Sequence, residues 1–283
     1  MVSECAHCSC KAVVKFKEGG KSRMNLNMFF FQRIWNNRFR NIIIFLILFF
    51  PTIEVIVYVM QALNMEEVYY PDYNFFLSGN VVGVGHTFQA LYLWPLPLYL
   101  LLIFSNDCLM DFETGYNHIL ISKMGKEKYI KDNLKKSFWG GSALIFMSLL
   151  INLAVIHILF AGGTGSPYSD ELMLDSFLYW ETKHTTLANL LFAIVCAIVS
   201  GTVAMAGTML SISVKQRKIV YSLILLLWFI LFLKKNSIML LFQVHSEYGL
   251  HVLVPILLQV VTLFGLLTLT FYIKETWFEK KSI

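Results

Sequence analysis

The fold of this chain is decided by residues 187–213, which read LANLLFAIVCAIVSGTVAMAGTMLSIS. This run contains no Asp, Glu, Lys or Arg, and it exceeds the ~20 apolar residues that a helix needs to cross the hydrocarbon core of a bilayer. A helix pairs its backbone N–H and C=O groups internally, which is what the interior of a membrane requires. The run therefore predicts a membrane-spanning helix.

Five further apolar blocks extend this prediction along the chain. Of the 283 residues, 57% are hydrophobic and only 14% are charged, against about 25% charged residues in soluble domains. Pro95 and Pro97 lie in the second block and predict a kink rather than an end, and the fifth block is short. We predict an all-α, polytopic membrane protein with six transmembrane helices, near Asn41–Ala62, His86–Ser105, Phe138–Ala161, Leu187–Ser213, Ile219–Leu233 and Val252–Ile273.

The distribution of Lys and Arg predicts how these helices are oriented. All but three of the 23 Lys and Arg residues fall before the first span, in the second and fourth loops, or after the sixth span. The exceptions are Lys183, Lys234 and Lys235, and the loops on their side are rich in Asp and Glu. By the positive-inside rule, the N and C termini are cytoplasmic. The net charge of +5 then reflects topology in a bacterial plasma membrane, and we expect no nucleic-acid partner.

The beginning of the chain differs from the rest. We expect translation to start at Met24, because codons for Lys17–Lys21 can form a purine-rich ribosome-binding sequence, which also indicates a bacterial gene. The intact mass of the natural protein would test this expectation. The predicted organisation is an upstream extension or disordered tail over 1–23, an amphipathic interfacial helix over 24–40 and a six-span domain over 41–283.

Motifs for metal or nucleotide chemistry are incomplete in this sequence. Cys5, Cys8 and Cys10 have the spacing of thiolate ligands, but no second cytoplasmic pair accompanies them, so we predict no metal site. Gly20-Lys21-Ser22 resembles the end of a phosphate-binding loop, but the position of its first Gly is occupied by Lys15. The H-E-x-x-H and G-x-S-x-G patterns are also missing. We predict that the chain is not itself an enzyme and binds no cofactor.

The cytoplasmic loop between the second and third spans predicts an amphipathic helix. Its apolar stripe has helical spacing and consists of Leu109, Phe112, Tyr116 and Ile119. Its acidic face consists of Asp107, Asp111 and Glu113, and Gly115 is expected to end the first helical piece. Such a helix could lie on the membrane surface or dock a cytoplasmic partner. An acidic face is repelled by anionic lipid headgroups, which favours docking.

With these features, the chain resembles the permease subunits of type-2 ATP-binding-cassette exporters, in which six spans pair with a separate cytoplasmic ATPase. The resemblance covers the layout from Met24 to the end and includes the amino-terminal amphipathic segment Phe29–Arg38. The family often has a short half-crossing helix between the fifth and sixth spans, which Ser237–Val244 could form. The most specific part is the loop between the second and third spans, where the matching residues are Asp111, Glu113, Gly115, Tyr116, Lys126, Lys128, Tyr129 and Lys131.

The resemblance implies a function and a set of partners. It implies export of a peptide, antibiotic or lipid-like molecule, with ATP and Mg held by a partner ATPase subunit. A second permease copy or a homologous permease would complete the pathway in the membrane lipid. The alternative is a non-transporting membrane enzyme, or a sensor or immunity protein. The implied ATPase-coupling residues are Asp107, Asp111, Phe112, Glu113, Gly115, Tyr116, Lys126 and Tyr129.

Polar and small residues inside the predicted spans are further candidates. A carboxylate at membrane depth is costly unless it is paired, hydrated or protonated, so Glu54 is either a functional group or a structural acid. Asn152 and His157 predict hydrogen-bonded helix contacts, and Trp228 predicts a packing or interfacial role. Small residues along the fourth span permit close contact with a neighbouring helix or with another subunit. These are Ala197, Ser200, Gly201, Ala204 and Thr208.

Overall fold

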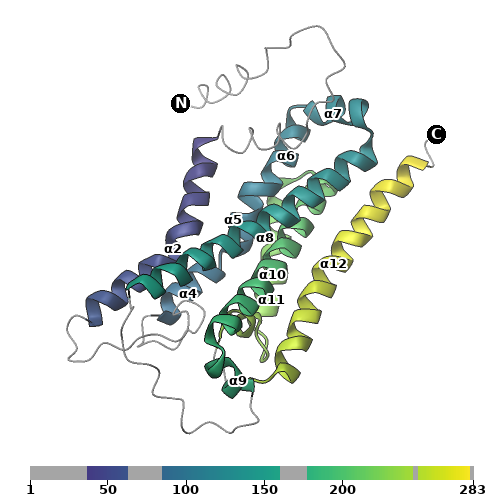
Figure 1. Cartoon of the computed structure of the whole chain (residues 1–283). Helices are drawn as coiled ribbons and strands as arrows, with labels where there is room; N and C mark the ends of the chain where they lie inside the picture. The colour runs from purple at the N-terminus through teal and green to yellow at the C-terminus, as the bar shows by residue number, and fades with distance from the viewer. Residues whose placement is uncertain (1–36, 63–84, 160–176, 245–247, 281–283) are drawn as a thin grey trace. The chain divides into compact units, whose positions relative to one another are not determined.

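The computed structural model of the chain describes residues 37–62, 85–159, 177–244 and 248–280 (Figure 1). These residues are helical throughout, apart from short connections, and none of them forms a strand. Five helices are long and apolar enough to cross a membrane, which is the make-up of a multi-pass membrane protein. The residues before Arg38 form a separate unit, and the description below concerns the unit that begins at Arg38.

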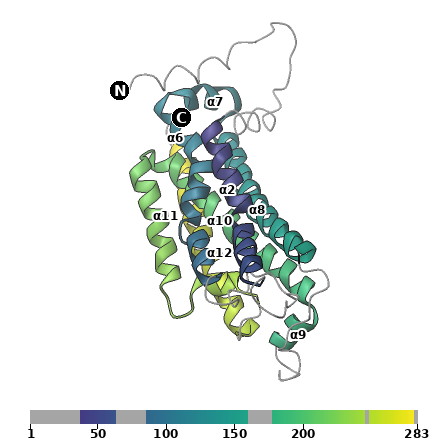
Figure 2. The ribbon, with the colours of Figure 1, turned by 90° about the vertical axis from the view of Figure 1, so that its left-hand side faces the viewer.

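The helices follow one another with few interruptions. Figures 1 and 2 place α6 and α7 at one end of the bundle and α9 at the opposite end. In chain order the elements are α2 (Arg38–Ala62), α4 (Gly85–Leu93), α5 (Leu96–Leu100), the π-helix η2 (Leu101–Ser105), α6 (Asn106–Glu113), α7 (Tyr116–Met124), α8 (Lys126–Leu159), α9 (Phe177–Lys183), α10 (Thr185–Val214), α11 (Arg217–Phe232), the 3-10 helix η4 (Ile238–Phe242) and α12 (Leu250–Lys280).

Five of the six predicted spans coincide with helices of crossing length, and the remaining one is shorter. The predicted span Ile219–Leu233 is α11, whose 16 residues fall below the ~20 that cross a bilayer. The basic run that precedes Phe138 is not a separate segment, because α8 begins already at Lys126. Arg38, Phe39 and Arg40 open α2 instead of ending an interfacial helix, since no helix breaker separates them from the apolar run. The rest of 24–40, and all of 1–23, lie outside the described residues.

The helix α10 is the centre of the bundle, and its small residues pack against α8. A Cβ added to Gly201 would lie 2.8 Å from the carbonyl oxygen of Phe138, and one added to Gly141 of α8 would lie 2.9 Å from the Cβ of Ala204. The two backbones therefore approach as closely as glycine allows. The predicted small residues face a neighbouring helix of the same chain, and all of them are buried: Ala197, Ser200, Gly201, Ala204 and Thr208.

The prolines of the second crossing helix bend it without ending it, as predicted. The chain continues from α4 through Pro95 and Pro97 into α5, η2 and α6. Because Pro97 has no N–H, the carbonyl of Leu93, four residues earlier, lacks its intrahelical donor. The indole Nε1 of Trp228 in α11 donates to this carbonyl at 3.1 Å. Trp228 is therefore a buried donor between helices, beyond the packing role that the sequence predicts.

Pro51 inside α2 likewise leaves a carbonyl without a hydrogen-bond donor, and α8 supplies the donor. The carbonyl of Ile47 lacks its intrahelical donor, and Ser148 Oγ donates to it at 2.7 Å. The same hydroxyl accepts a hydrogen bond from the Tyr92 hydroxyl of α4 at 3.2 Å. One turn further along α8, Asn152 Nδ2 donates to the carbonyl of Pro51 at 2.9 Å. The prediction that Asn152 makes a helix contact is confirmed, and the contact ties α2 to α8.

The segment between α11 and α12 turns back into the bundle. It contains η4, which lies within Ser237–Val244, where the resemblance implies a short helix. Gln89 Nε2 of α4 donates to the carbonyl of Phe242 at 3.1 Å, and Cys196 of α10 lies 3.6 Å from the carbonyl of Leu241. Buried side chains of other elements thus hydrogen-bond backbone carbonyls that have no partner within the short helix.

We expect Ser148→Ala to lower the free energy of unfolding by about 1–2 kcal/mol, because the Ile47 carbonyl is left buried without a donor. In a Pro51→Ala background the loss should be clearly smaller, since residue 51 regains an N–H that pairs with the same carbonyl and only the Tyr92 hydroxyl still loses its acceptor. Thermal unfolding of the wild type, both single variants and the double variant in a mild detergent measures this. An equal loss in both backgrounds would mean that Ser148 does not act through the proline.

Candidate functional site

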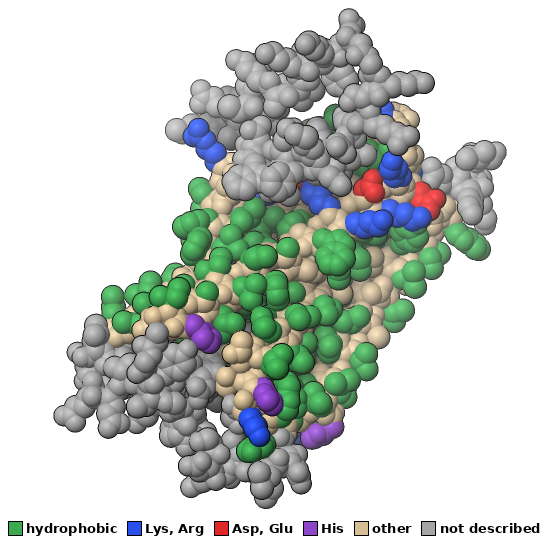
Figure 3. All heavy atoms as spheres, in the orientation of Figure 1, with side chains coloured by type: hydrophobic (Ala, Val, Ile, Leu, Met, Phe, Trp, Pro, Cys, Tyr) green, Lys and Arg blue, Asp and Glu red, His purple; other side chains and the backbone are tan. Residues whose placement is uncertain are grey.

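Charged side chains of the described residues gather at one end of the bundle (Figure 3). This is the end formed by α6 and α7, and a broad band of hydrophobic side chains covers the adjoining face. A charged end beside an apolar belt is the surface expected of a helix bundle in a membrane. Exposed apolar residues of the long helices include Phe45, Ile56, Met147, Leu258 and Leu266.

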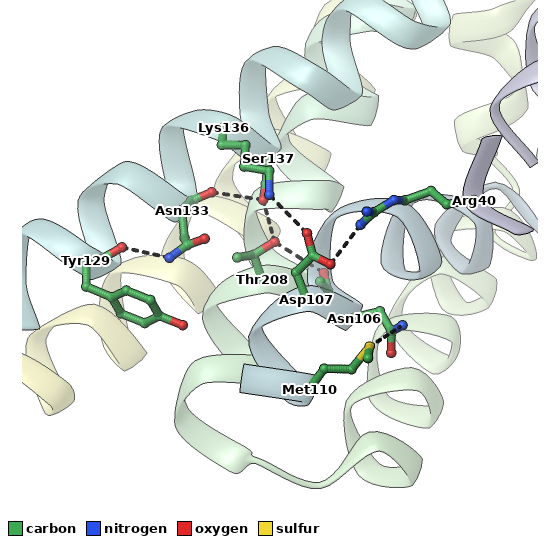
Figure 4. Close-up of polar contacts among 10 residues, drawn as sticks. Arg40, Asn106, Asp107, Met110, Tyr129, Asn133, Lys136, Ser137 and Thr208 are labelled. Carbon is green, nitrogen blue, oxygen red and sulfur yellow. Dashed lines mark hydrogen bonds and ion pairs between the residues drawn. The ribbon is translucent and has the colours of Figure 1, made fainter. Parts of the chain in front are cut away.

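A buried carboxylate joins three helices at the charged end. Asp107 of α6 pairs with Arg40 of α2, with 2.7 Å between Oδ1 and Nη1, and with Lys136 of α8, with 3.1 Å between Oδ2 and Nζ. The side chains of Asp107, Arg40 and Lys136 are 7%, 5% and 13% exposed. In Figure 4 the two cations reach the carboxylate from opposite sides. Each carboxylate oxygen thus has its own cation, which offsets the cost of removing these charges from water.

A group of hydroxyl side chains extends this polar cluster to α10. Ser137 Oγ of α8 lies 2.6 Å from Thr208 Oγ1 of α10, which lies 3.2 Å from Ser105 Oγ of η2. Ser137 also lies beside Asn133, to whose carbonyl its hydroxyl donates at 2.9 Å (Figure 4). Together with Asp107, these contacts join α2, η2, α6, α8 and α10 through polar groups at a single level of the bundle.

The exposed part of this end is the turn between α6 and α7. Gly115 has a φ of 71°, a left-handed conformation that costs glycine little. The prediction that Gly115 ends the first helical piece is confirmed. The expected separate amphipathic helix is instead an extension of the second crossing helix, because α6 follows η2 directly, and the short α7 comes after the turn. The turn is therefore the tip of a crossing helix.

The predicted acidic face is not one exposed surface. Asp107 and Asp111 are 5% and 3% exposed, whereas Glu113 is exposed and pairs with Arg217 at 3.2 Å. Residues 107 and 111 lie one turn apart on the side of α6 that packs against other helices, and residue 113 points away from that side. Of the predicted acidic face only Glu113 thus lies on the surface, while the two buried acids support the helix from within.

The predicted apolar stripe is divided in the same way. Leu109 is buried, whereas Phe112 and Ile119 are 37% and 50% exposed. The Nζ of Lys215 lies 4.7 Å from the centroid of the Phe112 ring, a cation–π contact between the α10–α11 connection and the tip. The exposed residues Phe112 and Ile119 give the tip an apolar surface of its own.

The remaining predicted coupling residues support the tip from below. Tyr129 of α8 is buried in a cluster with Met209 of α10, and Tyr116 packs against this cluster. Lys126 at the start of α8 pairs with Glu275 near the end of α12 at 2.9 Å. Of the predicted set, the structure thus exposes Phe112 and Glu113 and uses the others for the turn or its support.

The two cations that pair with Asp107 are not among the site residues that the sequence predicts. Arg40 and Lys136 are separated from Asp107 by 67 and 29 residues, and no periodicity in the sequence connects them. In the sequence they look like the other cations that flank spans. The available signal is the position of Asp107 at the end of an apolar run, where an unpaired carboxylate would be costly.

The predicted intramembrane polar residues lie away from the charged end. Glu54 of α2 is 5% exposed, and neither of its carboxyl oxygens has a hydrogen-bond partner among the described residues. Asn152 is fully buried, and its Oδ1 also lacks a partner there. His157 Nδ1 lies 2.8 Å from the carbonyl oxygen of Leu153 in its own helix. The cysteines near the amino terminus, by contrast, lie outside the described residues: Cys5, Cys8 and Cys10.

We expect Asp107→Ala to lower the free energy of unfolding by about 3–5 kcal/mol, because two buried cations lose their counter-charge. Glu113→Ala removes a carboxylate from the same helix but breaks only an exposed pair, so its cost should be at most about 1 kcal/mol. Thermal unfolding of both variants in one detergent compares them. Equal losses would contradict the assignment of Asp107 as the buried junction of three helices.

Comparison with known proteins finds a relative in a bacterium. The chain is 38% identical over 227 residues to the uncharacterized protein YybM of Bacillus subtilis strain 168, and the alignment covers 80% of this chain and 88% of YybM. No family model matches the chain, and no solved structure matches it. The similarity extends over most of both chains, so it concerns the bundle as a whole.

Proposed function

The chain belongs to the family of the B. subtilis protein YybM, and from the bundle and its charged end we propose that it is the permease subunit of an ATP-binding-cassette exporter. The observation that carries the proposal is the tip formed by α6, Gly115 and α7. It is an exposed turn on a crossing helix, and it is anchored to two other helices through Asp107. Such a turn lets a separate protein move the bundle by pushing at one point.

In the proposed topology α11 is the fifth of six spans. Its 16 residues rise about 24 Å, somewhat less than the ~30 Å of hydrocarbon. Lys234 and Lys235 follow it after one residue, and their long side chains can reach the headgroup region. The charged end carries nearly all Lys and Arg of the described residues, which supports placing this end, and both termini, in the bacterial cytoplasm.

In the proposed mechanism, motion of the tip reaches the spans through the buried ion cluster. A cytoplasmic ATPase that binds ATP and Mg closes on its nucleotide and displaces the exposed residues Phe112, His118 and Ile119. Because α6 continues η2, the displacement passes into the second span, and Asp107 transmits it to α2 and α8. The spans rock between inward- and outward-open arrangements.

The proposed assembly contains two permease subunits and the ATPase. A second copy of this chain, or a homologous permease, lines the other side of the pathway within the membrane lipid. The bundle presents an apolar belt and few charges at membrane depth, which supports a peptide, an antibiotic or a lipid-like molecule as the exported class.

We expect His118→Glu to lower the amount of ATPase that co-purifies with the chain by at least about tenfold, the loss that corresponds to ~1.4 kcal/mol of binding free energy. His118 is exposed at the tip, and a buried negative charge there would be unpaired in the complex. The measurement is co-purification from cells that express the chain with the ATPase of its gene cluster. The matched control is His251→Glu, an exposed histidine at the start of α12, at the opposite end.

Loss of the ATPase in His118→Glu alone supports coupling through the tip. Equal recovery in both variants would contradict that role. If no ATPase associates even with the wild type in a mild detergent, the non-transporting enzyme, sensor or immunity protein replaces the exporter.

A further inference from the structure

Glu54 and Asn152 place three hydrogen-bond acceptors without donors inside the bundle. Glu54 is 5% exposed and Asn152 is 0% exposed. The oxygens Oε1 and Oε2 of Glu54 and Oδ1 of Asn152 have no hydrogen-bond partner among the described residues. Buried polar atoms in native proteins are nearly always paired. Three unpaired acceptors on two packed helices therefore indicate a donor that the described residues do not supply.

Helical spacing places Glu54 on the side of α2 that Asn152 of α8 contacts. Asn152 Nδ2 donates to the carbonyl of Pro51 at 2.9 Å, so the Asn152 amide touches α2 at that residue. Glu54 lies three residues after Pro51, and residues three apart share one face of a helix. The carboxyl group is thus within about one helical turn of the point where Asn152 contacts α2.

No cation of the described parts of α2, α4 or α8 neutralises Glu54 at this depth. The last cation of α2 is Arg40, which lies about 21 Å away along the helix, counted at ~1.5 Å per residue, and pairs with Asp107. The last Lys of α8 is Lys136, which also pairs with Asp107, and α4 contains no Lys or Arg. Asp107 has two cations, whereas Glu54 has acceptors around it and no counter-charge from these helices.

We propose that Glu54 and Asn152 bind the primary ammonium group of the exported molecule. A primary ammonium carries one positive charge and three N–H donors, which match the carboxylate and the three unpaired oxygens. This inference rests on the proposed transport function and names the substrate class: an amphiphile with a primary amine on an apolar body.

The surroundings of Glu54 suit the apolar part of such a molecule. Phe50, one turn before Glu54 on α2, lies with its ring centroid 6.2 Å from that of Phe88 and 5.8 Å from that of Tyr92. These rings supply apolar surface and π faces near the carboxylate. Ile53, the residue directly before Glu54, is 42% exposed on the outer surface of α2.

The test uses the purified full-length chain in a non-ionic detergent with hexylammonium as the ligand. Binding is measured by calorimetry and by the ligand-induced rise of the unfolding temperature. We expect hexylammonium to bind the wild type and to bind Glu54→Gln at least about tenfold more weakly, since a buried charge pair is lost. Hexyltrimethylammonium has the same charge but no N–H, and hexanol has no charge, so both should bind much more weakly than hexylammonium.

The controls separate a ligand site from a structural acid. Glu127→Gln changes an exposed acid of α8 and should leave hexylammonium binding unchanged. Without ligand, Glu54→Gln should unfold at the same temperature as the wild type or higher, because an amide is easier to bury than a carboxylate. A lower unfolding temperature together with unchanged binding would overturn the proposal. If Glu54→Gln does not fold, Glu54→Asp should bind hexylammonium more weakly than the wild type, and equal binding would overturn it.

This test does not need the ATPase, so the two proposals can fail separately. Hexylammonium binding that depends on Glu54, without any associated ATPase, would leave the site standing and refute the exporter. An ATPase that binds through the tip, with hexylammonium binding that ignores Glu54, would leave the exporter standing and refute the site.

Discussion

Two prolines leave backbone carbonyls without intrahelical hydrogen-bond donors inside an apolar bundle. The side chains that donate to these carbonyls come from other helices and thereby determine which helices lie together. Ser148 serves the Ile47 carbonyl that Pro51 frees, and Trp228 serves the Leu93 carbonyl that Pro97 frees. In water such carbonyls would be hydrated, but in hydrocarbon the donor has to come from the protein. The kinks therefore specify neighbours: α2 is held to α8, and the second crossing helix to α11.

The second constraint is the close approach of α8 and α10. Glycines at 141 and 201 let the two backbones meet, and Ser137 and Thr208 continue the contact as hydroxyl groups toward the charged end. There Asp107 adds α2 and α6 to the same junction. Dispersion contacts alone would let apolar helices slide past one another. The hydrogen bonds to the carbonyls that proline frees, the glycine contacts and the ion cluster each form in only one alignment of the helices. The tip between α6 and α7 is thus attached to a bundle with little freedom at that end.

The sequence predicts the features that depend on local composition. The run 187–213 lies within α10, Gly115 ends α6, and the prolines at 95 and 97 bend the second helix without ending it. These features follow from apolar length, glycine at positive φ and the missing N–H of proline, which act within a few residues.

The features that the sequence does not predict depend on distant partners. The sequence predicts Asp107 and Asp111 as part of an exposed acidic face, but the buried side of α6 is set by its packing on α10 and by the ion pairs with α2 and α8. The sequence predicts only a packing or interfacial role for Trp228, because the acceptor of its indole N–H lies 135 residues away in the sequence. The sequence predicts the short length of α11. Length alone does not determine whether α11 crosses the membrane.

The most direct test asks whether the proposed ATPase partner contacts the tip. A photo-reactive amino acid at position 119, in place of the exposed Ile119, would be irradiated in membranes that contain the ATPase. The same reagent at position 233 replaces Leu233, which is 81% exposed just past the far end of α11. We expect an adduct with the ATPase from position 119 and none from position 233. Adducts from position 119 with lipid alone, in membranes where the ATPase is present, would contradict it.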